Sequence, residues 1–165
     1  HNELIQVPLL LYLPGEKSRR IPGLISLPDL TPTILDLAAV DIPNTVQAKS
    51  LLPLINGSVD TINEFVVTSA PFEQPGDSSK TVDDIAREVK ELSPSSITDG
   101  EWDLLYSIAG EPVELYRTKE DPGHQHNVYE QNQEIAAHLH AKFFSFLEDL
   151  GTTDSSVLEP RRRIK

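Results

Sequence analysis

The first third of the chain alternates between apolar segments and loops bounded by proline. Residues 7–14, VPLLLYLP, form an unbroken apolar run, which is typical of a strand buried on both faces of a parallel sheet. A second, shorter strand is predicted at residues 23–27, GLISL. Two such strands cannot make a covered parallel sheet alone. The pattern therefore predicts either that partner strands lie outside this chain or that the run belongs to another kind of fold.

A helix is predicted just after these strands. Thr31 can act as its N-cap, and Pro32 fits the first helical position, where the missing N–H costs nothing. The apolar residues that follow at helical spacing are Ile34, Leu35, Leu37 and Ala38. Pro43 ends the helix, because it disfavours helical geometry at the preceding residue. Helix N-termini can hold anions, so this helix start is either an anion site or part of the scaffold.

In the middle of the chain the sequence pattern predicts short helices and a short strand. A helical turn is expected at 49–57, stopped by Gly57, and a strand at 64–70. Thr81 and Asp84 have the spacing of a capping box, which predicts a helix over 81–92.

From residue 95 to residue 118 the pattern changes to short β-prone runs separated by Asp-Gly and Ala-Gly turns, which predicts an antiparallel meander. In its middle strand Trp102, Leu104 and Tyr106 share one face, whereas Asp103, Leu105 and Ser107 share the other. A last helix is predicted over about 131–150. Its expected buried stripe consists of Ile135, Leu139, Phe143, Phe146, Leu147 and Leu150.

Composition narrows the class of protein. The 165 residues include 26 acidic and 14 basic side chains, for a net charge of -12. This balance argues against nucleic acid or an anionic membrane as a partner, because phosphate contacts need clustered Lys and Arg. The basic run at 161–165 is expected to be a solvated tail. No apolar run approaches the roughly 20 residues that cross a bilayer, and the compartment stays unassigned.

The chain contains no cysteine and no methionine. The lack of cysteine excludes disulfides, Cys-ligated zinc and a thiol nucleophile within it. Because residue 1 is a histidine, we expect this chain to be a piece of a longer protein.

Five segments, in this order, resemble the C-terminal part of the sulfatase family, within the alkaline phosphatase-like superfamily. They are ELIQVPL at 3–9 with PG at 14–15, DLTPTILDLA at 29–38, KSLLPLING at 49–57, WDLLY at 102–106 and ELYRTKEDPGHQHNV at 114–128. The chain departs from the family at scaffold positions. Gln6 replaces an Arg, Ala39 and Ala48 stand where glycine is common, Arg117 replaces an Asp, and His124 replaces a Glu.

The resemblance implies an α/β fold in two parts. Residues 1–62 would form the C-terminal end of the alkaline phosphatase-like α/β domain, with its last strand and helices. Residues 63–150 would form a small α+β subdomain, a short antiparallel sheet with a C-terminal helix, and 151–165 a polar tail. In the family the helix at 29–38 is scaffold beside the sheet, so Thr31 and Pro32 would mark a helix start and not an anion site.

The resemblance also implies a chemistry, the hydrolysis of sulfate esters at a divalent metal, commonly calcium. The family's nucleophile is a Cys or Ser in a C/S-x-P-S/A-R motif, and no such motif occurs in this chain. The family's metal-binding pairs and sulfate-binding Lys precede the segment that matches Glu3. We therefore expect no catalytic, cofactor-binding or metal-binding residue here. The expected partner is an N-terminal catalytic part of the same protein, which would bind the metal and the sulfate ester.

Two other hypotheses stay open. The parent could be a phosphatase or phosphonate hydrolase of the same superfamily, with a Thr or Ser nucleophile in another context. The chain could also be a non-catalytic interaction domain with its own start codon.

Four of the histidines are candidate metal ligands by their spacing, in two pairs. His124 and His126 are two residues apart in a loop without an evident third ligand, which favours an ordinary polar loop. In the family this loop approaches the mouth of the active site, so a role at the substrate rim stays open. His138 and His140 cannot share a helix face, and both are predicted to lie on a solvated helix surface.

The other polar residues that could form a site are expected to have structural roles more than catalytic or metal-binding ones. Asp29 is expected to cap the helix or hold the loop before it, and it forms no ligand set with Asp36 and Asp41. Ser50 has no recognisable triad partners. Asn56-Gly57-Ser58 matches a glycosylation acceptor, a pattern that matters only in a secreted protein. The remaining acids considered, Asp83, Asp84, Glu148 and Asp149, are expected to be exposed.

Overall fold

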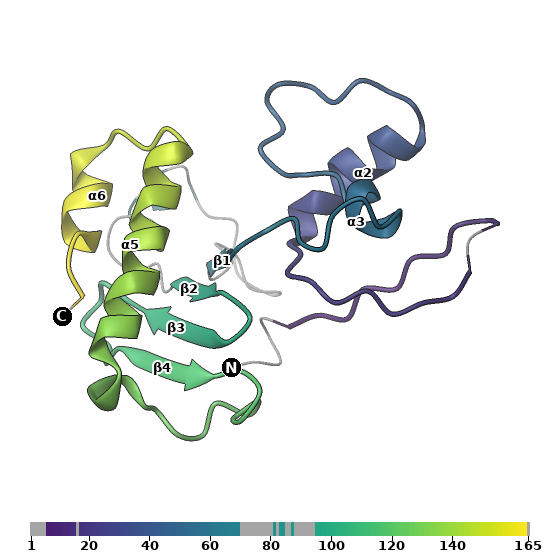
Figure 1. Cartoon of the computed structure of the whole chain (residues 1–165). Coiled ribbons are helices and arrows are strands. Elements are labelled where there is room, and N and C mark those ends of the chain that lie inside the picture. The colour runs from purple at the N-terminus through teal and green to yellow at the C-terminus, as the bar shows by residue number, and fades with distance from the viewer. Residues whose placement is uncertain are drawn as a thin grey trace. The chain divides into compact units, whose positions relative to one another are not determined.

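The computed structural model describes residues 6–15, 17–69, 81, 83–84, 87 and 95–164. The chain divides into two units, His1–Val66 and Val67–Lys165, here named unit 1 and unit 2. Unit 1 contains the 3-10 helix η1 (Leu27–Asp29) and the helices α2 (Leu30–Leu37) and α3 (Leu52–Ile55). Figure 1 shows these elements joined by long loops.

Unit 1 is organised around a polar centre. The carboxylate of Asp29 accepts hydrogen bonds from the backbone N–H of Ser26 at 2.8 Å and of Lys49 at 3.1 Å, and from Nδ2 of Asn63 at 2.8 Å. The hydroxyl of Thr33 donates to the carbonyl of Asp29 and accepts from the N–H of Leu51 at 2.8 Å. Because Asp29 and Thr33 are buried, these bonds satisfy groups that would otherwise be costly to desolvate.

The predicted role of Asp29 in holding the loop before α2 is confirmed. The predicted N-cap is wrong, because Asp29 and not Thr31 precedes the helix, and Pro32 lies two residues inside it. Pro32 still falls in the first turn, where N–H groups have no intrahelical acceptor. The predicted turn at 49–57 is confirmed as α3.

The two strands predicted in unit 1 are absent. Residues 6–13 and 23–26 lie in neither a helix nor a strand, and Leu27 begins η1. A strand needs a neighbour to pair its N–H and C=O groups, and the described residues of unit 1 provide none. The expected apolar face of α2 is likewise not buried within this unit, since Ile34 is 63% and Leu37 is 47% exposed.

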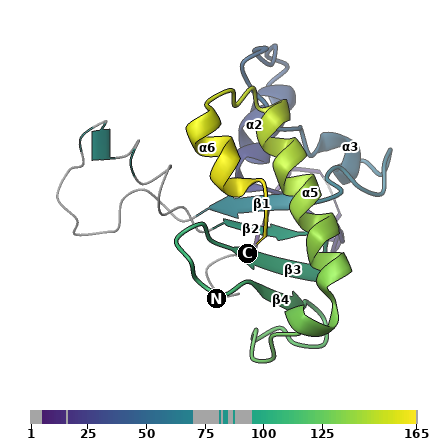
Figure 2. The same cartoon turned by 90° about the vertical axis from the view of Figure 1, so that its left-hand side faces the viewer.

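Unit 2 is built on a four-stranded sheet in the order β1-β2-β3-β4 (Figure 2). The strands are β1 (Val66–Ser69), β2 (Ser95–Thr98), β3 (Trp102–Tyr106) and β4 (Glu114–Arg117). Both β2–β3 and β3–β4 pair antiparallel, with Ile97 opposite Leu104 and Leu104 opposite Leu115. The predicted meander and the strand within 64–70 are therefore confirmed.

Helix α5 (Gln133–Asp149) follows the short 3-10 helix η2 (Tyr129–Gln131) and covers one face of the sheet (Figures 1 and 2). This face carries Trp102, Leu104 and Tyr106, as predicted. The helix buries Ala136, Leu139, His140 and Phe143 against it. Leu139 and Phe143 belong to the predicted stripe, whereas Leu150 is 38% exposed. The predicted mixed α/β fold class, with a short antiparallel sheet and a C-terminal helix, is confirmed.

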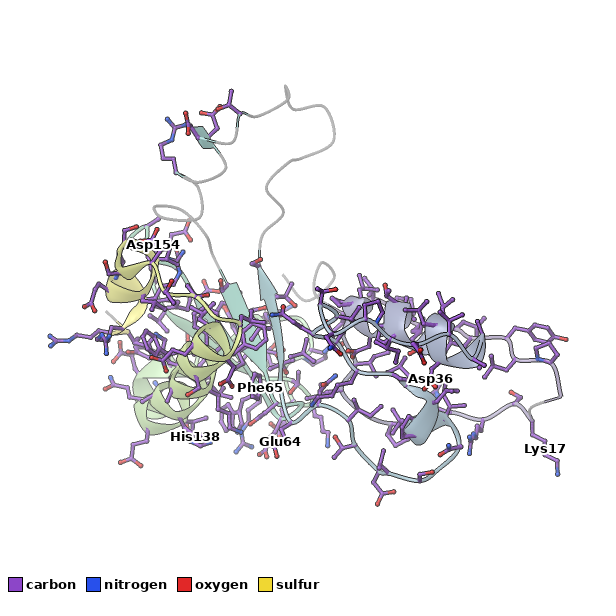
Figure 3. The ribbon with its side chains drawn as sticks, turned by 90° about the horizontal axis from the view of Figure 1, so that it is seen from above. Lys17, Asp36, Glu64, Phe65, His138 and Asp154 are labelled. Carbon is purple, nitrogen blue, oxygen red and sulfur yellow. The ribbon has the colours of Figure 1, made fainter. Side chains whose placement is uncertain are left out.

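The segment expected to be a polar tail contains a further helix, α6 (Ser155–Arg161). Asp154, labelled in Figure 3, caps it by accepting the N–H of Ser156 at 2.9 Å. The hydroxyl of Tyr106 donates to the carbonyls of Pro160 and Arg163, at 3.2 Å each. Arg161 is 3% exposed, whereas Arg162 and Arg163 are exposed, so the prediction that the basic run at 161–165 is a solvated tail is wrong for Arg161.

The helix predicted over 81–92 falls largely outside the described residues. Its capping box is present, because the N–H of Asp84 donates to Oγ1 of Thr81 at 3.2 Å and the N–H of Thr81 donates to Oδ2 of Asp84 at 3.1 Å. Across the described ranges, no helix is both long and apolar enough to span a membrane.

Candidate functional site

The most distinctive cluster of polar side chains lies on the face of the unit 2 sheet opposite α5. Period-two alternation in β3 turns Asp103 to this face, away from Trp102 and Leu104. The register pairs Asp103 with Tyr116 of β4, so their side chains lie side by side. The sequence pattern predicted the face of Asp103 correctly but gave no sign that Asp103 would be buried.

A tight loop after β4 brings His124 to the same face. The carboxylate of Asp121 accepts the N–H of Gln125 and the N–H of His126, the latter at 2.8 Å. The N–H of His124 donates to the carbonyl of Asp121 at 3.0 Å. His124 adopts a φ of 50°, a left-handed conformation that non-glycine residues rarely take. The turn thereby directs the imidazole back onto the sheet.

Asn127 fastens the other end of this loop to the free edge of β4. Its Oδ1 accepts the N–H of Leu115 at 3.0 Å, and its Nδ2 donates to the carbonyl of Val113 at 3.0 Å. The N–H of Val128 donates to the carbonyl of Leu115 at 2.9 Å. The loop therefore occupies backbone groups that an edge strand would otherwise present to solvent.

The centre of the cluster is a buried acid–histidine pair. Nε2 of His124 lies 2.8 Å from Oδ2 of Asp103, and the two side chains are 1% and 3% exposed. The imidazole stacks on the ring of Tyr116, with centroids 4.4 Å apart and planes 2° from parallel. Nδ1 of His124 is also buried and has no hydrogen-bond partner among the described residues.

Tyr116 stays protonated throughout the neutral range. Burial raises its pKa to about 12, and the hydrogen bond that its hydroxyl donates to Glu114, together with the charges of Glu114 and Asp121, adds to the effect. In contrast, the backbone N–H groups of Gln125 and His126 lower the pKa of Asp121. The loop is thus held by a charged carboxylate at its turn and by a neutral phenol under its histidine.

An acid–histidine pair is also the base half of a hydrolytic triad. Here the pair is sealed beneath its own loop, and its ring neighbour is a phenol that does not ionise near neutral pH. The chemistry that this arrangement supports is the fastening of the 119–128 loop to the sheet.

The other predicted residues are placed as follows. His126 is 80% exposed, with Nδ1 3.8 Å from Oδ2 of Asp121. His138, labelled in Figure 3, is exposed as predicted. His140 is buried, and its ring packs edge-on against the ring of Tyr106 with the ring centroids 4.9 Å apart. Its predicted place on a solvated surface is therefore wrong. Ser50 donates to Oδ2 of Asp36 at 2.7 Å, an interaction between chain segments of unit 1.

Sequence reasoning missed both members of the buried pair. One signal was available, because His124 stands where the family resemblance expects a Glu. Asp103 is an acid between two apolar residues of a predicted strand. Among the residues that the structure describes, no group of three or more His, Cys, Asp or Glu side chains is arranged to hold a metal ion.

Comparison with known proteins defines the class. Residues 1–149 match the family described as N-sulphoglucosamine sulphohydrolase, C-terminal, and the chain belongs to this family. It is 26% identical over 150 residues to arylsulfatase K of Mus musculus, covering 87% of this chain and 25% of that protein. It is 37% identical over 67 residues to arylsulfatase K of Rattus norvegicus, covering 40% of this chain and 12% of that protein. The chain thus spans a quarter or less of the length of these relatives.

Solved structures share the fold. A 2-O GAG sulfatase superposes with a TM-score of 0.57 at 21% identity, covering 81% of this chain and 28% of that one. The phosphonate monoester hydrolase of Agrobacterium radiobacter superposes with a TM-score of 0.54 at 18% identity, covering 78% of this chain and 25% of that one. Together with the family match, this confirms the resemblance to the C-terminal part of sulfatases.

Proposed function

We propose that this chain is the non-catalytic C-terminal part of a sulfatase-like hydrolase whose complete form hydrolyses sulfate esters. In this proposal the nucleophile and the metal ligands belong to an N-terminal part, and unit 1 packs against that part. The observation that carries the proposal is the distribution of exposed apolar side chains.

These side chains gather in unit 1. Of the large hydrophobic residues that are exposed in the described part of the chain, all except Leu150 lie between Val7 and Val59. Leu10 is 95% exposed and Tyr12 is 87% exposed. They belong to the run that the sequence predicted to be a buried strand. Contiguous apolar surface of this kind marks a protein–protein interface, so the run is best explained as a segment that pairs with a sheet supplied by another part of the protein.

An open groove of about 640 Å³ supports this interpretation. It lies within unit 1, and its lining consists of residues 9–13 and 17–21, Gly23, Ile25, Leu51, Leu54 and Ile55. Burying one Leu side chain contributes roughly 1.5–3 kcal/mol. Filling the groove with side chains of the catalytic part would therefore stabilise the complete protein considerably.

The divalent metal implied by the family is assigned to the N-terminal part. This assignment is consistent with the described residues, among which no three or more His, Cys, Asp or Glu side chains are grouped to hold a metal ion. Asp29, a buried acid of unit 1, already accepts three hydrogen bonds. No step of the reaction is therefore assigned to residues of this chain.

A second candidate is supported by the phosphonate monoester hydrolase, which superposes nearly as well as the sulfatase. The reaction of such a parent would be the hydrolysis of a phosphorus ester. The fold of the C-terminal part does not separate the two reactions, because the nucleophile lies elsewhere.

The test is the gene sequence on the 5′ side of the codon for His1. A sulfatase parent is expected to encode Cys or Ser in a C/S-x-P-S/A-R motif. A Thr or Ser nucleophile in another context would support the phosphorus-ester hydrolase instead. A start codon directly before His1 would overturn the proposal in favour of a separate interaction domain.

A further inference from the structure

A candidate modification site lies at the end of helix α3. The sequence Asn56-Gly57-Ser58 is the only Asn-x-Ser/Thr sequence with x other than Pro in the chain, and residues 56–60 are all exposed. An exposed sequence of this type is the acceptor for N-linked oligosaccharides. The conformation of residues 56–58 adds to what the sequence pattern alone indicates.

The end of α3 fixes the conformation of these three residues. The N–H of Ser58 donates to the carbonyl of Pro53 at 2.9 Å, and the N–H of Gly57 donates to the carbonyl of Leu54 at 3.3 Å. Gly57 has a φ of 79°, the left-handed conformation of a glycine that ends a helix in this way. The acceptor sequence is therefore a defined turn that projects from the helix end.

The side chains of Asn56 and Ser58 are already in contact within this turn. Both the N–H and the hydroxyl of Ser58 donate to Oδ1 of Asn56, the N–H at 2.9 Å. Nδ2 of Asn56 donates no hydrogen bond to any described residue. A Cβ added at Gly57 would meet no atom within 4 Å. The carboxamide thus has its oxygen engaged by the hydroxyl and its nitrogen without an acceptor among the described residues, and the space next to the Cα of Gly57 is open.

We infer that Asn56 is an N-glycosylation acceptor. The co-substrate is an oligosaccharide linked through pyrophosphate to a lipid. In the reaction a bond forms between Nδ2 of Asn56 and C1 of the first sugar, while the bond from C1 to the pyrophosphate oxygen breaks. The electron pair leaves with the lipid pyrophosphate, and one proton of Nδ2 passes to a base of the transferase.

This site would also limit the docking surface proposed for unit 1. A glycan on Asn56 needs the C-terminal end of α3 to face solvent in the complete protein. The catalytic part must then cover the surface of residues 7–13 and α2 without covering residues 56–58. The inference itself does not depend on the parent's chemistry, since glycosylation requires only the acceptor and its transferase.

The experiment is expression of the whole chain behind a cleavable secretory signal in eukaryotic cells. Extracts and medium are treated with peptide N-glycosidase, and Asn56 is examined by mass spectrometry. We expect a glycosidase-sensitive form of the wild type, loss of that form in Asn56→Gln and Ser58→Ala, and its retention in Ser58→Thr. Asn44→Gln, at an exposed asparagine outside any acceptor sequence, should leave the form unchanged.

The glycan is attached in the secretory pathway before release, so cell extracts report on variants that are not secreted. A wild-type chain whose secretory signal has been cleaved off, and which still carries no glycan at Asn56, would overturn the inference. Conversion of Asn56 to Asp in samples that were not treated with the glycosidase, with no glycosylated form present, would overturn it as well.

Discussion

Nε2 of His124 and Oδ2 of Asp103 are 2.8 Å apart and almost completely buried. The pair joins the loop at 119–128 to strand β3 of the unit 2 sheet, 21 residues earlier in the chain. Removing one partner of a buried pair leaves the other group without its hydrogen bond in a site that water does not reach.

Asp103→Ala is therefore expected to lower the free energy of unfolding by about 1–3 kcal/mol. The matched control is Glu120→Ala, which removes the exposed partner of Arg117 at 3.1 Å and is expected to cost about 0–1 kcal/mol. Urea denaturation measures both. Similar losses for the two variants would show that the buried pair does not hold the loop.

Phe143→Ala should also be damaging, because Phe143 is 4% exposed between α5 and the sheet. Lost burial and the resulting cavity predict a cost of about 3–5 kcal/mol. Ala137→Ser changes an exposed position of the same helix and should cost less than about 0.5 kcal/mol. Equal effects in thermal unfolding would mean that the buried face of α5 is wrongly assigned.

Thr33→Val tests the polar centre of unit 1. The substitution keeps the side-chain shape but removes the hydroxyl that is hydrogen-bonded to Asp29 and Leu51. The free energy of unfolding is therefore expected to fall by about 1–3 kcal/mol. Thr31→Val, at an exposed position in the same helical turn, is the control and should be nearly neutral. Hydrogen exchange at the amide of Leu51 should increase in the first variant only. Unchanged protection would contradict the proposed network.

His140 is expected to make the free energy of unfolding depend on pH. Burial lowers its pKa below the usual value of 6.5, and the backbone of Arg161 opposes this effect only in part. Below pH 6.5 the unfolded chain therefore binds more protons at this residue than the folded chain, so its contribution to stability falls as the pH falls. Above pH 6.5 that contribution no longer changes.

His140→Gln should make the free energy of unfolding less sensitive to pH below about 6.5. His138→Gln, on the exposed side of α5, should leave the dependence as in the wild type. Both are measured by denaturation over a pH series. An unchanged pH dependence in His140→Gln would contradict the assigned cause.

The exposed apolar surface of unit 1 should cause self-association when the chain is isolated. Leu10→Ser is expected to reduce the sedimentation coefficient at high concentration, because Leu10 is 95% exposed. Leu150→Ser, the matched change at an exposed leucine of unit 2, should have little effect. A wild-type chain that sediments as a compact monomer at all concentrations would argue against a missing partner.

The sequence predicted unit 2 better than unit 1, and the reason is physical. The meander and α5 pack on each other, so the alternation at Trp102, Leu104 and Tyr106 and the helical spacing of Leu139 and Phe143 report contacts made within the chain. In unit 1 most apolar residues of 7–14, and Ile34 and Leu37 of α2, are exposed. Their pattern predicted elements whose partners are not among the described residues.

The buried pair could not be predicted because it depends on register and on an unusual turn. Asp103 meets Tyr116 only through the pairing of β3 with β4, and His124 reaches them only through its φ of 50°. Neither the period of the sequence nor the spacing of the two residues contains that information. His140 was missed for a related reason, since helical spacing alone did not reveal that Tyr106 and Arg161 would enclose it.

The central claim is that the catalytic groups belong to another part of the protein. It is tested most directly by assaying the purified, folded chain with a chromogenic aryl sulfate and an aryl phosphate, with and without calcium, magnesium or manganese. Hydrolysis of either ester needs a nucleophile and groups that stabilise the developing charge. We predict no turnover above background under any of these conditions. Metal-dependent turnover that follows the chain through purification and survives removal of contaminants would contradict the claim and would direct attention to the loop of His124 and His126.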